Sequence, residues 1–320
     1  MMQIPRFFEF FKPDSRKAGW FCIAVSGQGA HFVQVKRAGP QVAVLACVYY
    51  PLEKVTSAAL EKIVKELRWS SYQFTTLLAP DEYQILMVDA PNVPAAEMKS
   101  AVRYLIKDSL NYRVEDATVD VLHIPGNKGA ANKPQALYAI AASNDTLQKR
   151  IGLFEKARIK LSVIDIPEMA QRNVAALYET PGRALAMLTF DSCGGLLTFT
   201  CDGELYLSRR LDITSGQLQD ADAELRQQCF DRVELEVQRS MDYFDRQFHH
   251  VSLNRMLVCA PDGDGLVNLL AATLGLPVAA LDLAQVMDVS AVPPLLLDRA
   301  FMLEALPALG AALRHERRAL

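Results

Sequence analysis

The sequence lacks an apolar run long enough to cross a membrane. Its nearest candidate, residues 266–281, is interrupted by Asn268, Gly275 and Pro277, whereas a membrane helix needs about 20 apolar residues. The first residues also lack the apolar stretch and small-residue cleavage site that mark a signal peptide. We therefore expect a protein without a transmembrane helix and without a cleaved secretion signal.

Cysteines are few and scattered. The 320 residues contain 6 of them, with no C-x-x-C pair and no neighbouring histidine at metal-ligand spacing. Several lie inside strand-like apolar runs, where cysteine behaves as a small hydrophobic residue. We predict reduced thiols and no metal site.

Neither charge sign dominates. Lysine and arginine number 34 and the acidic residues 37, giving a formal net charge of −3, so the basic field of a general nucleic-acid-binding protein is missing. We expect no nucleic-acid partner.

The hydrophobic content is high enough for large buried cores. The chain is 51% hydrophobic and 22% charged, which excludes wholesale disorder.

One pattern of strands and turns occurs twice in the chain. Each copy has an apolar strand, a polar turn, a second strand, a turn, a third strand and a helix. The first copy comprises 21–25, 26–29, 31–36, 38–40, 42–49 and a helix from Ser57, and the second comprises 184–190, 191–195, 196–200, 202–203, 204–211 and a helix over 230–248. Such a repeat predicts an α/β fold made of two related halves with a cleft between them.

A shorter unit separates the two copies. A strand at 83–88, a helix at 95–110 and a strand at 118–123 precede an exposed loop at 126–134. About 45 residues suffice for a small subdomain but not for an independent domain. We therefore predict an N-terminal segment (1–19), a first domain (20–178) with an inserted α+β subdomain at about 83–125, and a second domain (179–320). The phenylalanines and basic residues of segment 1–19 suit contact with its own domain, a partner or a lipid surface.

Several short motifs follow one another in a characteristic order and spacing, and none of them is specific alone. They are FFKP at 10–13, the strand 21–26, Met98–Val102, Ala141–Ser143, Ile164–Ala170, Arg239–Phe244 and Leu309–Arg314. Together they resemble the PilM/MshI family of cytoplasmic proteins that assemble type IV and mannose-sensitive haemagglutinin (MSHA) pili. That family is similar to the cell-division protein FtsA, and this chain resembles MshI more than PilM. The resemblance implies a duplicated actin-like (ribonuclease H-like) fold.

The resemblance also implies where a nucleotide would lie. Actin-like proteins hold ATP and Mg²⁺ between two hairpin turns and a glycine loop, because glycine lets the backbone approach phosphate and a carboxylate orders the metal. The corresponding positions here are Ser26, Gly27, Gln28, Gly29, Asp191, Ser192, Cys193, Gly194, Gly195, Gly263 and Gly265.

These turns depart from the family pattern. The Asp-x-Gly of the first turn is replaced by Ala24, Val25 and Ser26, and Cys193 stands where the second turn needs glycine. If each defect costs ~1–3 kcal/mol, affinity falls ~10²- to 10⁴-fold. We therefore expect a degenerate site, no cofactor and no enzymatic activity. The alternative is an ATP-binding protein, an ATPase or a sugar-kinase-like phosphotransferase.

For a partner, the resemblance implies the cytoplasmic tail of a bitopic PilN-type protein. The protein would be a scaffold at the cytoplasmic face of the inner membrane, holding that tail in a groove between the first domain and the insert. The candidate contacts are Tyr83, Ile85, Met98, Val102 and Leu105. A further possibility is a membrane-anchored filament like that of FtsA, for which residues 303–313 would have to form an amphipathic anchor instead of a closing helix.

Overall fold

The computed structural model describes residues 20–39, 41–69, 73–126, 136–261 and 264–314. The N-terminal segment 1–19 and most of the loop predicted at 126–134 lie outside these residues. Within the described ranges, no helix has both the length and the apolar character needed to span a membrane.

The first half is built on a five-stranded sheet. Its strands are β1 (Phe21–Ser26), β2 (Gly29–Ala38), β3 (Gln41–Pro51), β4 (Gln73–Leu77) and β8 (Lys160–Asp165), in the order β3-β2-β1-β4-β8. Side chains alternate between its faces, as a strand requires. Phe21 and Ile23 enter the core beneath α1 (Ser57–Glu66) and α3 (Asn144–Lys156), whereas Cys22 faces the second half.

The second half repeats this arrangement. Its strands are β9 (Ala184–Asp191), β10 (Gly194–Cys201), β11 (Glu204–Leu211), β12 (Leu253–Cys259) and β13 (Val278–Ala280), in the order β11-β10-β9-β12-β13. In both sheets the first three strands form an antiparallel meander and the last two run parallel to the central strand. The predicted duplication of an α/β unit is confirmed.

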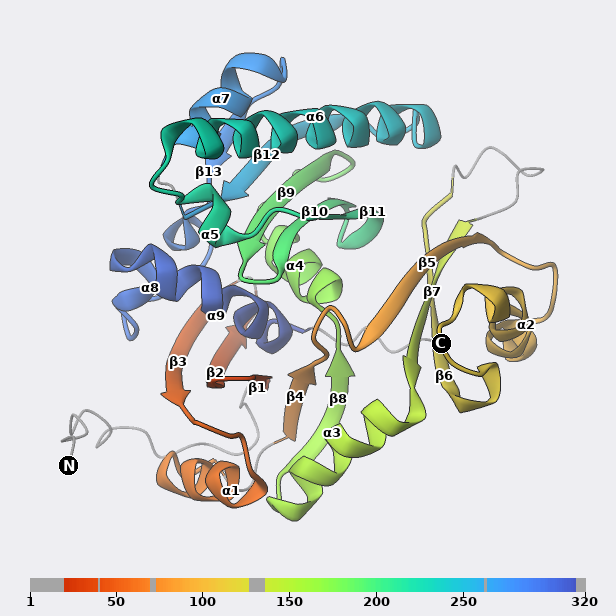
Figure 1. The fold of residues 1–320 in the computed structure, drawn as a ribbon, viewed down its shortest axis with the longest axis vertical. Coiled ribbons are helices and arrows are strands. Elements are labelled where there is room, and N and C mark those ends of the chain that lie inside the picture. The colour runs from red at the N-terminus through yellow and green to blue at the C-terminus, as the bar shows by residue number, and fades with distance from the viewer. Residues whose placement is uncertain (1–19, 40, 70–72, 127–135, 262–263, 315–320) are drawn as a thin grey trace.

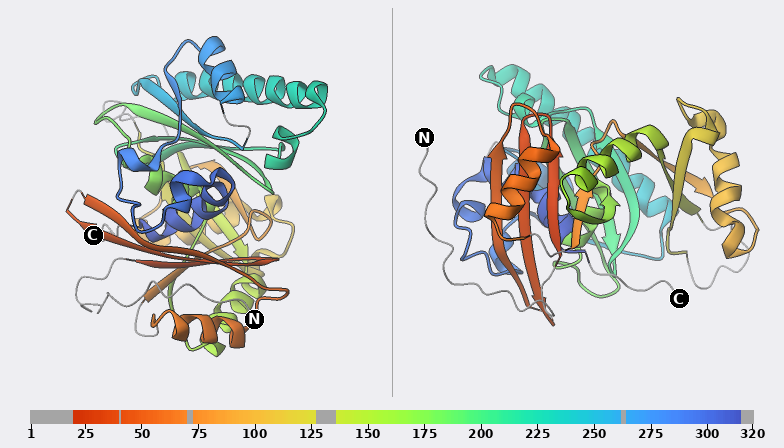
Figure 2. Two further views of the ribbon diagram at one scale, coloured as in Figure 1. Left: turned by 90° about the vertical axis from the view of Figure 1, so that its left-hand side faces the viewer. Right: turned by 90° about the horizontal axis from the view of Figure 1, so that it is seen from below.

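Two helices fill the space between the sheets, α4 (Pro167–Ala175) and α9 (Arg299–Ala312). On the far face of the second sheet lie α6 (Ala223–Gln247) and α7 (Gly265–Thr273), so the two halves stack as alternating layers of helices and sheets (Figures 1 and 2). The short helices α5 (Ser215–Leu218) and α8 (Pro294–Leu297) complete the second half.

The predicted insert is longer than its sequence pattern indicated. Its sheet has the order β5-β7-β6, with β5 (Tyr83–Asp89), β7 (Ala136–Ser143) and β6 (Ala117–His123). The unit therefore continues to Ser143 rather than ending near residue 125, because β7 pairs antiparallel with both other strands. One face of the sheet is covered by α2 (Met98–Leu105), which is shorter than the predicted helix 95–110 because 3₁₀ turns flank it.

Helix α9 is a core helix rather than a membrane anchor. Its residues from Met302 to Ala312 are largely buried between the sheets. A Cβ atom on Gly310 would lie 2.2 Å from the carbonyl oxygen of Ala170 in α4, and Asn173 donates a 2.9 Å hydrogen bond to the carbonyl of Gly310. Arg314, just beyond α9, binds the Asp165 carboxylate at 2.7 Å. The motifs at 164–170 and 309–314 thus contact each other, and the anchor interpretation of residues 303–313 is wrong.

Candidate functional site

The two predicted nucleotide turns occupy equivalent places in the two halves. Ser26 pairs with Gly29 across a two-residue turn, and Asp191 pairs with Gly194 across another. Ser26 therefore stands where the second half has Asp191. Ala24 lies two residues further back in β1, paired with His31.

The first turn is covered by the neighbouring edge strand β3. The hydroxyl of Tyr49 donates to the carbonyl of Gln28 at 2.8 Å, and the hydroxyl of Ser26 donates to the carbonyl of Gly29 at 3.2 Å. A Cβ atom on Gly29 would lie 2.3 Å from the carbonyl oxygen of Tyr50, whereas Gly27 has open space around it. Glycine at position 29 is thus required by the close approach of β3.

The second turn uses its carboxylate internally. Oδ1 of Asp191 accepts hydrogen bonds from the backbone N–H groups of Cys193 (2.7 Å) and Gly194 (3.0 Å), across Ser192. These are amides that a phosphate-binding turn would direct at its ligand. The carboxylate therefore caps its own turn, and two of the turn's donors already have an acceptor.

Packing also explains the two glycines of the second turn. A Cβ atom on Gly194 would lie 2.7 Å from the carbonyl oxygen of Leu211 in edge strand β11, and one on Gly195 would lie 2.8 Å from the ring of Phe190. The thiol-bearing Cys193 is exposed at the tip. At both positions the neighbouring protein atoms leave no room for a Cβ atom, so packing alone requires glycine there.

The cavity beside Asp191 is small. It measures about 20 Å³ and is lined by Asp191, Gly194 and Arg210 together with side chains of α4 and α9, among them Leu303 and Pro307. This is the room of about one water molecule, far less than a triphosphate needs. No residue of the first turn lines this cavity, so the structure does not bring the two turns together around it.

The third predicted element opens helix α7. Gly265 is the first residue of α7, and Gly263 lies outside the described residues. The carbonyl of Ala260 accepts a 3.3 Å hydrogen bond from Arg299, whose guanidinium also lies 3.9 Å from the Asp264 carboxylate. Within the described part of the chain, no group of three or more His, Cys, Asp or Glu residues could hold a metal ion.

Two of the five predicted partner contacts are core residues. Tyr83 is buried with its hydroxyl bound to other side chains, and Val102 is fully buried against β7. Neither can meet a partner in this conformation, because Val102 lies on the face of α2 that packs on its own sheet and the Tyr83 hydroxyl is held by Glu168 and Arg210. Ile85 and Met98 are half-buried, and Leu105 is 54% exposed. Next to Leu105, Tyr104 is 70% exposed, which its sequence position did not indicate.

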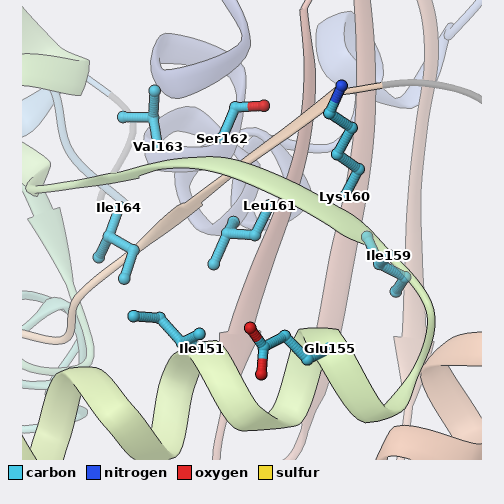
Figure 3. Close-up of a pocket in the computed structure, with 8 residues that line it drawn as sticks. All are labelled: Ile151, Glu155, Ile159, Lys160, Leu161, Ser162, Val163 and Ile164. Carbon is cyan, nitrogen blue, oxygen red and sulfur yellow. The ribbon is translucent and has the colours of Figure 1, made fainter.

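A groove that the sequence did not predict lies between α3 and the edge strand β8. It encloses about 440 Å³, within the range of ligand-binding sites. Figure 3 shows Ile151 and Glu155 reaching from α3 toward the strand, with Leu161 and Ile164 pointing back toward the helix. Apolar and polar residues alternate from Ile159 to Val163, a pattern typical of a strand, but nothing in it shows that the strand is at an edge.

Among the described residues, β8 pairs only with β4, so its outer backbone edge is available. Edge strands offer a row of N–H and C=O groups to which an extended chain can pair. The groove therefore combines apolar side chains with backbone hydrogen-bonding groups, which suits an extended peptide.

Comparison with known proteins agrees with the topology. The structure is similar to a solved "PilM-PilN type IV pilus biogenesis complex" chain, with a TM-score of 0.66, 19% identity, and coverage of 94% of this chain and 99% of that one. The fold is the duplicated actin-like fold. No protein-family model and no curated protein matches the chain.

Two other solved structures align less closely. A Bacteroides thetaiotaomicron protein with an actin-like ATPase fold and unknown function gives a TM-score of 0.48 at 12% identity, covering 86% of this chain and 93% of its own. The cytoplasmic domain of EpsL, an inner-membrane component of the type II secretion system of Vibrio cholerae, gives 0.44 at 12% identity, covering 84% and 87%.

Proposed function

We propose that this protein is a non-enzymatic scaffold of a type IV-like pilus assembly machine of the MSHA type. It works at the cytoplasmic face of the inner membrane and binds the cytoplasmic tail of a bitopic PilN-type protein. The proposal is supported by the likeness to the PilM-PilN structure over nearly the whole chain. The observation that carries it is the groove between α3 and β8.

The groove suits a short extended segment. Such a segment pairs its backbone with the outer edge of β8 and places alternate side chains against Ile151, Leu161 and Ile164. Glu155 and Lys160, also in the lining, bring one charge of each sign to complement charges on the segment. Backbone pairing supplies affinity, and the side-chain positions supply specificity.

We further propose that the scaffold works without a bound nucleotide. Three features support this: the carboxylate of Asp191 is engaged in its own turn, Tyr49 covers the first turn, and the cavity beside Asp191 has the volume of about one water molecule.

Peptide binding tests the scaffold function. Synthetic N-terminal peptides of bitopic proteins encoded beside this gene should bind the purified protein, measured by fluorescence anisotropy. Ile151→Glu, which puts a charge in the groove, should weaken binding about tenfold or more, since burying an unpaired charge costs several kcal/mol. The matched control is Leu235→Glu on α6, because Leu235 is 45% exposed and Ile151 40%. Equal losses in both variants, or no binding by any peptide, would contradict the proposal.

Nucleotide titration tests the alternative enzyme. A fluorescent ATP analogue with Mg²⁺ should show no saturable binding in the micromolar range. Micromolar binding that Asp191→Ala abolishes, accompanied by phosphate release or transfer to a sugar, would establish the enzyme instead.

A further inference from the structure

A buried polar contact chain begins beside the groove. Arg150 precedes Ile151 in α3 and is itself buried. Its guanidinium donates to the carbonyl of Leu77 at 3.0 Å and to the carboxylate of Glu82. The same carboxylate accepts a 2.8 Å hydrogen bond from the N–H of Ala79. Arg150 therefore fixes the linker that leads from the first sheet into the inserted subdomain.

The chain continues through the next residue, Tyr83, which begins β5. Its hydroxyl donates to the carboxylate of Glu168 and accepts from Arg210 at 2.8 Å. Arg210 also binds the Glu168 carboxylate at 2.9 Å, and Glu168 is fully buried. Burial and then the Glu168 carboxylate raise the pKa of Tyr83, and Glu168 keeps the pKa of Arg210 above its usual value despite burial. The tyrosine is thus a neutral donor to a charged pair.

These three residues belong to three different parts of the molecule. Tyr83 is in the inserted subdomain, Glu168 opens α4, and Arg210 is in edge strand β11 of the second half. Further contacts join the subdomain to the second half. The hydroxyl of Tyr138 accepts from the N–H of Ser208 at 3.0 Å and donates to the carbonyl of Tyr206 at 3.4 Å, and Tyr243 contacts the sulfur of Met87 at 3.6 Å. The subdomain is therefore docked on β11 and α6 as well as joined to the first half (Figure 1).

Such a network behaves as a unit. Every charged group in it has a partner. Removing Arg210 would leave the fully buried Glu168 carboxylate without its opposite charge, which is far more costly than losing a surface pair. Removing Arg150 would take from Glu82 its bound cation. A disturbance at Arg150 reaches Glu82 and hence the position of Tyr83. The groove wall and the second half are connected by two sets of side-chain contacts, Arg150–Glu82 and Tyr83–Glu168–Arg210, which are joined by the peptide bond between Glu82 and Tyr83.

We propose that Arg150, Glu82, Tyr83, Glu168 and Arg210 form a latch that couples the groove wall α3 to the docking of the inserted subdomain on β11. Displacement of Arg150 releases Tyr83 from Glu168 and Arg210, and the subdomain then separates from the second half more often. That a partner segment is what displaces Arg150 rests on the proposed function. The latch itself does not require a partner.

Hydrogen exchange of the full-length protein tests the latch without any ligand. In Arg150→Met, amides of β5 and of β11 around Ser208 should exchange roughly tenfold faster or more, as expected for loss of a buried charged hydrogen bond. Tyr83→Phe should give the same pattern. The matched control is Lys149→Met, which removes the neighbouring cation and its exposed pair with Asp145 and should leave β11 unchanged.

Faster exchange confined to residues 77–82 in Arg150→Met, with β11 as in the wild type, would overturn the latch. A variant counts as folded when its amide exchange in β12, far from the latch, is the same as in the wild type. If Arg150→Met does not fold, Glu82→Gln is used in its place. Failure of every peptide to bind would remove the proposed function but leave this result standing.

Discussion

The two halves share one strand order but treat their sheet edges differently. Each antiparallel edge strand is covered by the other half: β3 by backbone bonds of Val42 and Val44 with Asp288, and β11 by the Tyr138 hydroxyl on Ser208. At the opposite edges, β8 has six residues and a groove beside it, whereas β13 has three. The two halves therefore have the same sheet topology, but the candidate binding surface is the long β8 edge of the first half.

The two turns differ less than their sequences indicate. Gly29 and Gly194 occupy equivalent positions, and each lies against a carbonyl of its edge strand, that of Tyr50 or Leu211. The requirement they share is close backbone packing.

The largest expected change in stability concerns the contact between α4 and α9, where the two halves meet. Gly310→Ala should destabilise the protein by about 3 kcal/mol, because the new Cβ atom would lie 2.2 Å from a backbone oxygen of α4 and overpacking a rigid contact costs ~1–3 kcal/mol or more. Chemical denaturation measures this change. Gly152→Ala in α3, where nothing lies within 4 Å, should instead stabilise by about 0.5–1 kcal/mol. A stabilising Gly310→Ala would show that the helices are not in close contact.

The equivalence of the two turns predicts a matched pair of smaller losses. Gly29→Ala and Gly194→Ala should each cost about 2 kcal/mol in the free energy of unfolding, with Gly29→Ala the larger because its Cβ atom would lie 2.3 Å from a backbone oxygen, against 2.7 Å at Gly194. Gly27→Ala, in open space, should be close to neutral. If only one of the two substitutions destabilises, the turns are not equivalent.

The smallest expected effect is on the pH dependence of stability, and it comes from a histidine that only the first half has at this position. His31 is buried near the rings of Tyr49 and Phe301, and burial lowers its pKa from 6.5 to about 4. By strand register its counterpart in the second half is Leu196. As the pH falls below 6.5, the unfolded chain binds the proton before the folded one does, so stability is lost between about pH 6.5 and pH 4.

That loss should be about 1.4 kcal/mol between pH 7.5 and pH 5.5, since one pH unit corresponds to 1.36 kcal/mol. His31→Leu should reduce the pH dependence of unfolding by this amount. An unchanged pH dependence would mean that His31 is protonated as readily in the folded protein as in the unfolded chain.

Much of the fold could be predicted because its signals are local. Period-two alternation and turn residues defined the strands of both halves, and their repeated order gave the duplication. The motifs at 164–170 and 309–314 could be recognised in order, but their contact through Ala170 and Gly310 depends on helix packing that no local pattern encodes.

The candidate site was harder to predict from the sequence, because it too depends on contacts between residues far apart in the chain. The burial of Tyr83 results from partners 85 and 127 residues away in the chain, and Tyr49 covers a turn that lies 21 residues earlier. The central position of β7 and the open edge of β8 are properties of strand order. Alternation of apolar and polar residues predicts which side chains of a strand share a face, but it does not predict which other strands pair with it.

The mutual covering of β3 and β11 has a consequence for fragments of this protein. A gene fragment encoding either half alone would leave one edge strand without its cap, and an uncapped edge pairs readily with other chains. We expect such fragments to be insoluble when expressed separately and to regain solubility only when both are produced together.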